Sequence, residues 1–205
     1  MEKRNTLLLT VIAVATLLVA VVGATFAYFA TNTSSATGNV GVTANTAAGG
    51  NSVFTATGDT ISLNVTAADM QQSAIAEGAA KASDNATLTV SYTSGSTNST
   101  SCTYNVYYKW ENGSSTYTPV TSGTSSKEFT YAVSGDMTVS ETNFVATDTA
   151  EHQLGTQQTI TNASVDTPST KSYTVDAKFY NLNADQSANQ NASFKLSVYV
   201  GNIVC

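Results

Sequence analysis

Residue types that support catalysis or metal binding are scarce in this sequence. His152 is the only histidine, so neither a histidine-rich zinc site nor a metalloprotease helix with two histidines can be assembled. The sequence lacks the GxSxG motif of serine hydrolases and a glycine-rich phosphate loop, and no two carboxylates are marked as a catalytic pair by their local sequence. We therefore interpret His152 as a solvated loop residue. We predict that the protein is not an enzyme and has no catalytic residue, metal or cofactor.

One segment, NLNADQSANQNASF at 181–194, has the spacing of a calcium loop. Oxygen-bearing side chains occupy alternate positions, at Asn183, Asp185, Ser187, Asn189 and Asn191. The segment has a single carboxylate, no glycine at the sharp bend and no glutamate at the twelfth position. We therefore predict a hairpin connection ordered by Asx turns instead of a calcium site.

The two cysteines, Cys102 and Cys205, are placed at the ends of two predicted strands. Cys102 begins one strand and Cys205 follows the last strand of the chain. In an antiparallel pair the start of one strand lies beside the end of its partner, so we predict a disulfide between them. A bond between two subunits and two free thiols remain the alternatives.

Alternating apolar and polar residues predict the strands that position these groups. The clearest run has Cys102, Tyr104, Val106, Tyr108 and Trp110 at every second position, and Asn112-Gly113 then predicts a turn. Similar patterns cover 61–67, 88–92, 129–133, 173–179 and 194–200, and weaker ones cover 40–44, 53–55, 137–139 and the surroundings of Phe144. The sequence therefore predicts eight to ten strands.

This pattern predicts an all-β fold, an antiparallel β-sandwich or jelly roll over residues 46–205. One short helical insertion is expected at Ala68 to Ala82, where Ala and Gln are frequent and Asp69 is placed as a cap. Tyr107, Tyr180 and Tyr199 fall on the polar side of their strands, so we expect them to be exposed aromatic residues.

An export segment precedes the predicted domain. Leu7 to Ala30 contains no charged residue and follows Lys3 and Arg4. Its length suits a transmembrane anchor, whereas the small residues Ala24 and Ala27 offer a signal peptidase a cleavage site. Residues 1–30 are therefore a signal peptide or an N-terminal transmembrane helix, and either would place the following residues outside the cell.

The composition of the remaining chain suits an external protein. After Ala30 it contains six lysines, no arginine and 13 acidic residues. Because phosphate binding needs clustered cations, nucleic acid is not an expected partner. The length suits one ordinary domain with a sizeable core.

The junction GATFAYFATNTSSATGNVGVTA, at 23–44, resembles the leader junction of Gram-positive proteins processed by the dedicated signal peptidase SipW. That group includes TasA, a biofilm fibre subunit, and the camelysin-like surface proteins. The segment SYTVDAKFYNLNADQSANQNASFKLSVYV, at 172–200, is similar to the closing hairpin of exported proteins with this leader. The resemblance covers about the first 45 and the last 35 residues. It implies a jelly-roll subunit at the cell surface of a Gram-positive bacterium, whose partners are signal peptidase, the membrane and other copies of itself. Camelysins have been described as metalloproteases, but with one histidine that activity is not transferred here.

Two functions remain open from the sequence. The first is a self-assembling fibre or biofilm-matrix subunit that donates an N-terminal strand, for which 31–45 is the candidate segment because Val40, Val42 and Ala44 alternate. The second is a membrane-anchored adhesin or glycan-binding domain, which would use exposed aromatic residues and meet host or matrix glycans.

Overall fold

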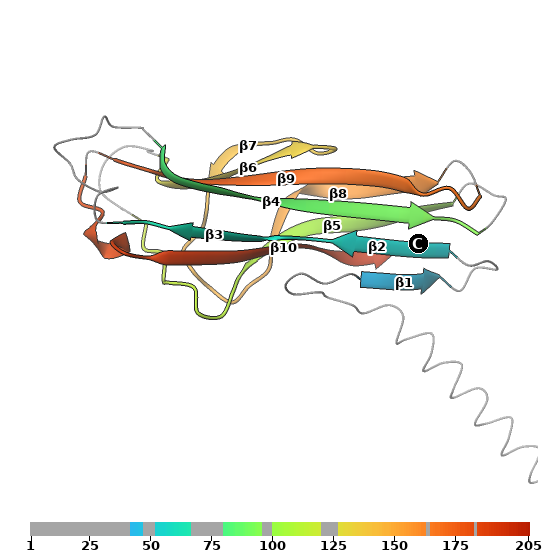
Figure 1. Ribbon diagram of the computed structural model, residues 1–205, viewed down its shortest axis with the longest axis horizontal. Coiled ribbons are helices and arrows are strands. Elements are labelled where there is room, and N and C mark those ends of the chain that lie inside the picture. The colour runs from blue at the N-terminus through green and yellow to red at the C-terminus, as the bar shows by residue number, and fades with distance from the viewer. Residues whose placement is uncertain are drawn as a thin grey trace, which may run out of the picture.

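Two antiparallel β-sheets stack in a sandwich (Figure 1). The structure, a computed structural model, describes residues 42–46, 52–66, 80–95, 100–119, 127–162, 165–182 and 184–205. Every strand pair is antiparallel. The six-stranded sheet has the order β1 (Val42–Thr46), β2 (Ser52–Thr57), β4 (Ala80–Thr93), β9 (Ser169–Tyr180), β6 (Phe129–Gly135) and β7 (Val139–Asn143). The four-stranded sheet has the order β3 (Thr60–Asn64), β10 (Ser193–Val204), β5 (Thr100–Trp110) and β8 (His152–Asn162).

The strands follow the predicted alternation where one face is covered by the other sheet. In β5 every second residue from Cys102 to Trp110 is buried, and the residues between them are partly exposed. The turn at Asn112-Gly113 is closed by a hydrogen bond from the Ser114 amide to the Glu111 carbonyl, and Gly113 has a φ of 84° that favours glycine. The prediction of an all-β fold is confirmed.

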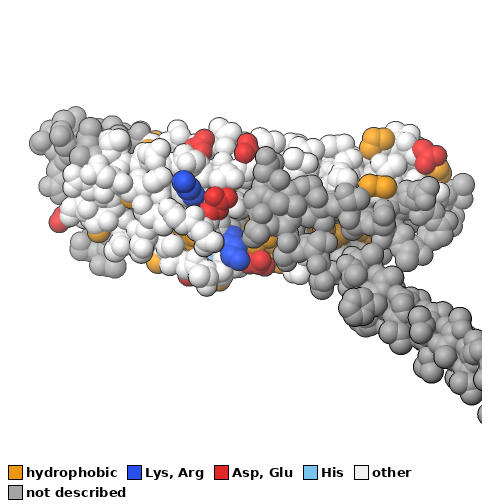
Figure 2. Space-filling model, turned by 60° about the horizontal axis from the view of Figure 1, so that its bottom comes forward, with side chains coloured by type: hydrophobic (Ala, Val, Ile, Leu, Met, Phe, Trp, Pro, Cys, Tyr) orange, Lys and Arg blue, Asp and Glu red, His pale blue; other side chains and the backbone are white. Residues whose placement is uncertain are grey.

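An aromatic cluster fills the core between the sheets. Phe129 of β6 is fully buried and its ring lies 4.6 Å from that of Phe144 and 4.9 Å from that of Phe194, between ring centroids. Trp110 and Tyr117 also pack against Phe129. Deeper along the sandwich, the hydroxyl groups of two buried tyrosines, Tyr104 and Tyr173, lie 2.6 Å apart and join the two sheets. On the face that Figure 2 shows, the described side chains are mostly uncharged and polar, and few of them are charged.

The chain passes from one sheet to the other between β2 and β3. Gly58 and Asp59 are the two residues between these strands. A Cβ at Gly58 would overlap the carbonyl oxygen of Val198 in β10, so glycine is required for this close approach. The Asp59 carbonyl accepts a hydrogen bond from the Val198 amide at 3.2 Å. Because the chain changes sheets here, β3 runs beside only the first part of β10.

Two features of the sequence prediction need correction. The described part of the expected helix, Ala80 to Ala82, is the start of strand β4, where Ala82 pairs with Phe179 of β9; residues 68–79 of that prediction lie outside the described residues. Backbone pairing along the whole of β9 outweighs the helical preference of alanine. The sequence pattern does not predict strand β8. Leu154 and Ile160 are the only large apolar residues of this strand that are buried, so the alternation of apolar and polar residues is too weak to recognise.

Candidate assembly interface

Sheet edges are the sites where another chain could add a strand, because an edge strand presents unpaired amide and carbonyl groups. Among the described strands, the outermost ones are β1 and β7 in the larger sheet and β3 and β8 in the smaller one. They differ in how their backbone groups are covered.

Strand β1 contains part of the candidate donor segment. It pairs with β2 over five residues, with Val42 opposite Ala56 and Ala44 opposite Phe54. Phe54 and Ala56 are both buried. Val40 lies outside the described residues, but residues 42–45, expected to be a tether, belong to the sheet of their own chain. This part of the segment therefore has a defined register on β2.

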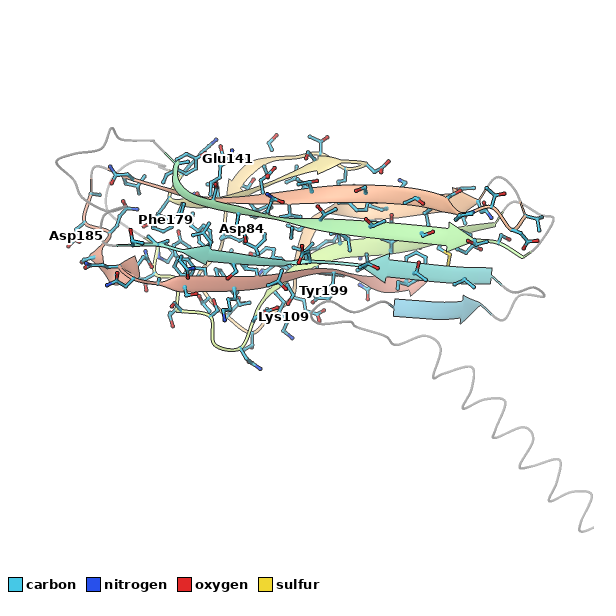
Figure 3. The ribbon with its side chains drawn as sticks, in the orientation of Figure 1. Asp84, Lys109, Glu141, Phe179, Asp185 and Tyr199 are labelled. Carbon is cyan, nitrogen blue, oxygen red and sulfur yellow. A yellow bond between two sulfur atoms is a disulfide. The ribbon has the colours of Figure 1, made fainter. Side chains whose placement is uncertain are left out.

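The edge strand β3 is capped by a carboxylate from the opposite sheet. The Ser62 amide of β3 donates a hydrogen bond to Oδ2 of Asp84, on β4, at 2.6 Å. Figure 3 shows Asp84 between these two strands. The contact occupies an edge amide and places a charge where an added strand would lie, which opposes pairing with another chain.

Strand β8 is interrupted by a bulge whose carbonyl groups are capped by glutamine side chains. The register with β5 shifts between Tyr104 and Val106, and Gly155 adopts a φ of 64°. The Gln153 side chain donates to the Gly155 carbonyl at 3.1 Å, and that of Gln158 donates to the Thr156 carbonyl at 3.0 Å. A bulge of this kind twists an edge away from potential partners.

Strand β7 is short and is capped in a similar way. It has five residues, and the Thr142 hydroxyl donates to the Ser140 carbonyl at 2.9 Å. Its partner β6 carries a register shift between Tyr131 and Val133. Of the four edges, β3, β7 and β8 thus each carry a device that disfavours strand addition.

The three tyrosines expected to be exposed do not form a common patch. Tyr199 was expected on the surface but is only 4% exposed, because its ring stacks against Tyr107 of the paired strand with centroids 5.9 Å apart. Tyr107 is half-buried, and its hydroxyl accepts hydrogen bonds from the side chains of Asn202 at 2.6 Å and Asn105 at 3.2 Å. Tyr180 is half-buried on the other sheet. These positions do not supply the flat aromatic surface expected of an adhesin.

Tyr180 instead takes part in a polar network centred on Glu141 of β7. Glu141 accepts hydrogen bonds from the Lys127 ammonium at 2.7 Å, from the Tyr180 hydroxyl at 2.5 Å and from the Thr130 hydroxyl at 2.9 Å. The bond from Lys127 contributes most, followed by that from Tyr180, and together they lower the pKa of Glu141 to about 2. The same contact with Glu141 raises the pKa of Tyr180 to about 12.

Stability is expected to depend on Glu141 at acid pH. The pKa of Glu141 falls from 4.5 to about 2 on folding. The contribution of its carboxylate is therefore complete above pH 4.5 and is lost as the pH falls toward 2. At pH 7, Glu141→Gln should lower the free energy of unfolding by about 0.5–1 kcal/mol, since the ion pair is partly exposed.

Urea unfolding between pH 7 and pH 2 measures this effect. The difference between the original protein and Glu141→Gln should shrink below about pH 4.5. Asp176→Asn is the matched control, because it removes one carboxylate from the outer side of β9, two strands away, and makes the same change in net charge. A difference for Glu141→Gln that stayed constant down to pH 2 would contradict the prediction.

The loop with calcium-like spacing is organised around a buried carboxylate. Gln186 and Asn189 point inward, and their side-chain amides donate to Glu128 at 3.0 and 3.3 Å. The Tyr117 hydroxyl also donates to Glu128, at 3.1 Å. Asp185 accepts a hydrogen bond from the Ser187 amide at 2.9 Å, which is the predicted Asx turn.

This arrangement ties three segments together at one end of the sandwich. Asn189, in the short 3-10 helix Ser187–Asn189, both accepts from the Thr118 amide and donates to the Thr118 carbonyl. Asn183 lies outside the described residues. Within the described ranges, no group of three or more His, Cys, Asp or Glu side chains is placed to hold a metal ion.

His152 is not the solvated loop residue that was expected. It is the first residue of β8, its ring stacks on Tyr108 with centroids 4.7 Å apart, and its Nε2 atom lies 2.8 Å from Oδ1 of Asp148. The contact with His152 lowers the pKa of Asp148. Through these two contacts, the His152 ring links Asp148, in the connection between β7 and β8, to the buried Tyr108 of β5.

The predicted disulfide between Cys102 and Cys205 is present. The two Cα atoms are 4.1 Å apart, and the bond joins residues separated by 103 positions. It links β5 to the residue that follows β10, next to the pairing of Thr103 with Val204. The cysteines are therefore joined within one chain, and the alternatives of free thiols and of a bond between subunits are excluded for this structure.

The predicted leader lies outside the described residues, including Lys3, Arg4, Leu7, Ala24 and Ala27. In the portion of the chain that is described, no helix has the length and apolar character needed to cross a membrane.

Comparison with known proteins does not assign the chain to a group. No family model matches it, and it has no significant match among curated proteins or solved structures.

Proposed function

We propose that this protein is an exported cell-surface structural protein that assembles into an extracellular fibre or biofilm matrix by strand donation. The donor is residues 31–45, and the partner is another copy of the chain. The N-terminal apolar helix, the jelly-roll connectivity and the location on a Gram-positive surface that the leader resemblance implies are parts of this proposal. So is the absence of an enzymatic activity.

The observation that carries the proposal is the contrast between β1 and the other edges. Among the described strands, β1 pairs with β2 alone, over five residue pairs. The other outermost strands carry a carboxylate cap, a bulge with glutamine caps or a threonine cap. Exchange of β1 between copies would preserve every β1–β2 contact while linking two subunits, so it costs little free energy apart from that of association.

The secreted environment is supported by the disulfide. Disulfides persist in oxidising compartments such as the cell exterior, and they are rare in the reducing cytosol. The Cys102–Cys205 bond is consistent with export by the predicted leader.

Replacement of residues 31–45 by a Gly/Ser segment of equal length tests the proposal. The unaltered mature protein should form filaments, detected by light scattering and electron microscopy. The variant should remain a folded monomer, because it keeps both sheets except β1. Filaments formed by the variant would exclude strand donation from this segment.

Two matched double variants distinguish the effect of disrupting the packing of β1 on β2 from the effect of adding negative charge to β1. Val42→Asp with Ala44→Asp alters positions paired with the buried residues Ala56 and Phe54. Thr43→Asp with Asn45→Asp adds the same charge at positions paired with Thr55 and Val53, which are partly exposed. Only the first variant should abolish filaments. Equal loss in both would indicate charge repulsion instead of strand exchange.

A further inference from the structure

The disulfide between Cys102 and Cys205 joins a buried residue to an exposed one. Cys102 is 0% exposed and belongs to the core, on strand β5, which β10 and β8 flank. Its pairing partner on β8, Ile160, is also buried. Cys205 follows the end of β10 and is exposed to solvent. Figure 3 shows the bond, in yellow, toward one end of the sandwich. A reagent in solution therefore reaches this disulfide from the side of Cys205.

The segment 202–205 is held to the sheet by few contacts. The register with β5 is irregular after Gly201, and beyond it the one described pair is that of Val204 with Thr103. Asn202 adopts a φ of 52°, and its side chain donates one hydrogen bond, at 2.6 Å, to a tyrosine hydroxyl of β5. Val204 is 66% exposed. Because little apolar area is buried here, this segment can move when the disulfide is open.

The two cysteines therefore differ in their access to thiol chemistry. Thiol–disulfide exchange proceeds through a mixed disulfide, at a rate that depends on access to the sulfur that reacts. A thiol enclosed in the core reacts slowly with an outside reagent, because the reagent cannot reach it. In the folded chain, Cys205 is the cysteine that a partner can engage, and Cys102 lies within bonding reach of Cys205.

We propose that Cys205 is the site at which a thiol–disulfide oxidoreductase forms this bond, and that Cys102 is the resolving thiol. The Cys205 thiolate attacks the disulfide of the oxidised enzyme, whose sulfur–sulfur bond breaks, and one enzyme sulfur takes a proton and becomes a thiol. The Cys102 thiolate then attacks the Cys205 sulfur of the mixed disulfide and releases the second enzyme thiol. Two electrons and two protons pass to the enzyme, which ends as a dithiol. The inference does not depend on the proposed fibre function.

The surroundings of Cys205 suit a protein partner. Residues 199–204 carry no charge, so no charge is desolvated when an enzyme surface covers them. Val204, directly before Cys205, offers an exposed apolar side chain for contact. Because structural disulfides form in oxidising compartments, this partner belongs to the external location that the leader predicts.

Single-cysteine variants test which sulfur is engaged. Cys102→Ala keeps the Cys205 thiol and Cys205→Ala keeps the Cys102 thiol. Both variants are reacted with the neutral disulfide dithiodipyridine, and their folding is checked by circular dichroism. The Cys205 thiol should react faster by about 100-fold or more, because the Cys102 thiol is exposed only by local opening. In concentrated guanidinium the two rates should become similar. Equal rates in the folded variants, or a faster Cys102, would overturn the proposal.

The native protein covers the case in which Cys205→Ala does not fold. The oxidised protein is exposed to reduced glutathione and quenched with acid, the free thiol is alkylated, and the products are mapped by mass spectrometry. Glutathione should be found on Cys205, with Cys102 as the alkylated thiol. Glutathione found mainly on Cys102 would show that the buried sulfur is attacked and that the assigned order is wrong.

A trapping form of thioredoxin tests the protein partner. Its second CxxC cysteine is replaced by serine, and its first carries thionitrobenzoate, whose release reports attack by a thiol. A covalent complex should form with Cys102→Ala and not with Cys205→Ala. Adding Val204→Ser to Cys102→Ala should slow complex formation by about fourfold, the effect of one lost methyl contact, and leave the reaction with dithiodipyridine unchanged. If the added change affected both reactions equally, or neither, the protein partner would be wrong and small disulfides such as oxidised glutathione would remain as the oxidant.

Discussion

Replacing both Cys102 and Cys205 with alanine is expected to lower the free energy of unfolding by up to about 4.7 kcal/mol, the value for a closed loop of about 100 residues. The bond joins residues 103 positions apart, so it removes many conformations from the unfolded chain. It also holds the end of β10 against β5, where the register of the two strands is irregular. Guanidinium unfolding of the two proteins, at one temperature and pH, measures the change.

Reductant provides the matched control for the disulfide. Unfolding of the original protein in reductant should approach that of the double variant, whereas the variant itself should not respond. The denaturant slope should be larger without the bond, because the unfolded chain then exposes more surface. A loss below about 1 kcal/mol would contradict the prediction. It would mean that residual contacts between the β5 and β10 segments already restrain the unfolded chain when the disulfide is absent.

The sequence is sufficient to predict the strands whose two faces differ most. In β5, β9 and β10 large apolar residues alternate with polar ones over most of the strand, because one face is buried against the other sheet. Strand β8 shows why others are missed. Between Leu154 and Ile160 its residues are Gly, Thr and Gln, and the bulge at Gly155 breaks the period of two.

The candidate interface is less accessible to sequence reasoning because it depends on long-range pairing. The alternation of Val42 and Ala44 was visible, but their register on β2 requires knowledge of which strands are neighbours. Asp84 looks like any surface carboxylate until β3 and β4 come together at a corner of the sandwich. The change of sheet at Gly58 likewise depends on the approach of β10, more than a hundred residues later. Burial of Tyr199 has a similar origin, since strand parity places its ring outside and the stacked Tyr107 covers it.

The aromatic core should respond most strongly at Phe129. Phe129→Ala is expected to lower the free energy of unfolding by about 3–5 kcal/mol, because the side chain is fully buried and its removal leaves a cavity. Five aromatic rings of the described residues pack against it, from both sheets and from the two connections that flank β6 and β7. Chemical denaturation followed by tryptophan fluorescence is a suitable measurement, since Trp110 lies 6.1 Å from this ring.

Phe129→Leu is the matched control for this prediction. It keeps an apolar side chain of similar volume and removes the ring contacts, so it should cost less than the alanine variant, about 1–1.5 kcal/mol. Similar losses in both variants would assign the contribution of Phe129 to ring geometry instead of to the filled volume.

Phe129 also follows Glu128 directly, so a shift of its backbone would loosen the hydrogen bonds that Glu128 accepts from Gln186 and Asn189. The alanine variant should therefore weaken amide protection in the 184–192 connection as well as in β6, whereas a loss confined to the core would leave that connection unchanged.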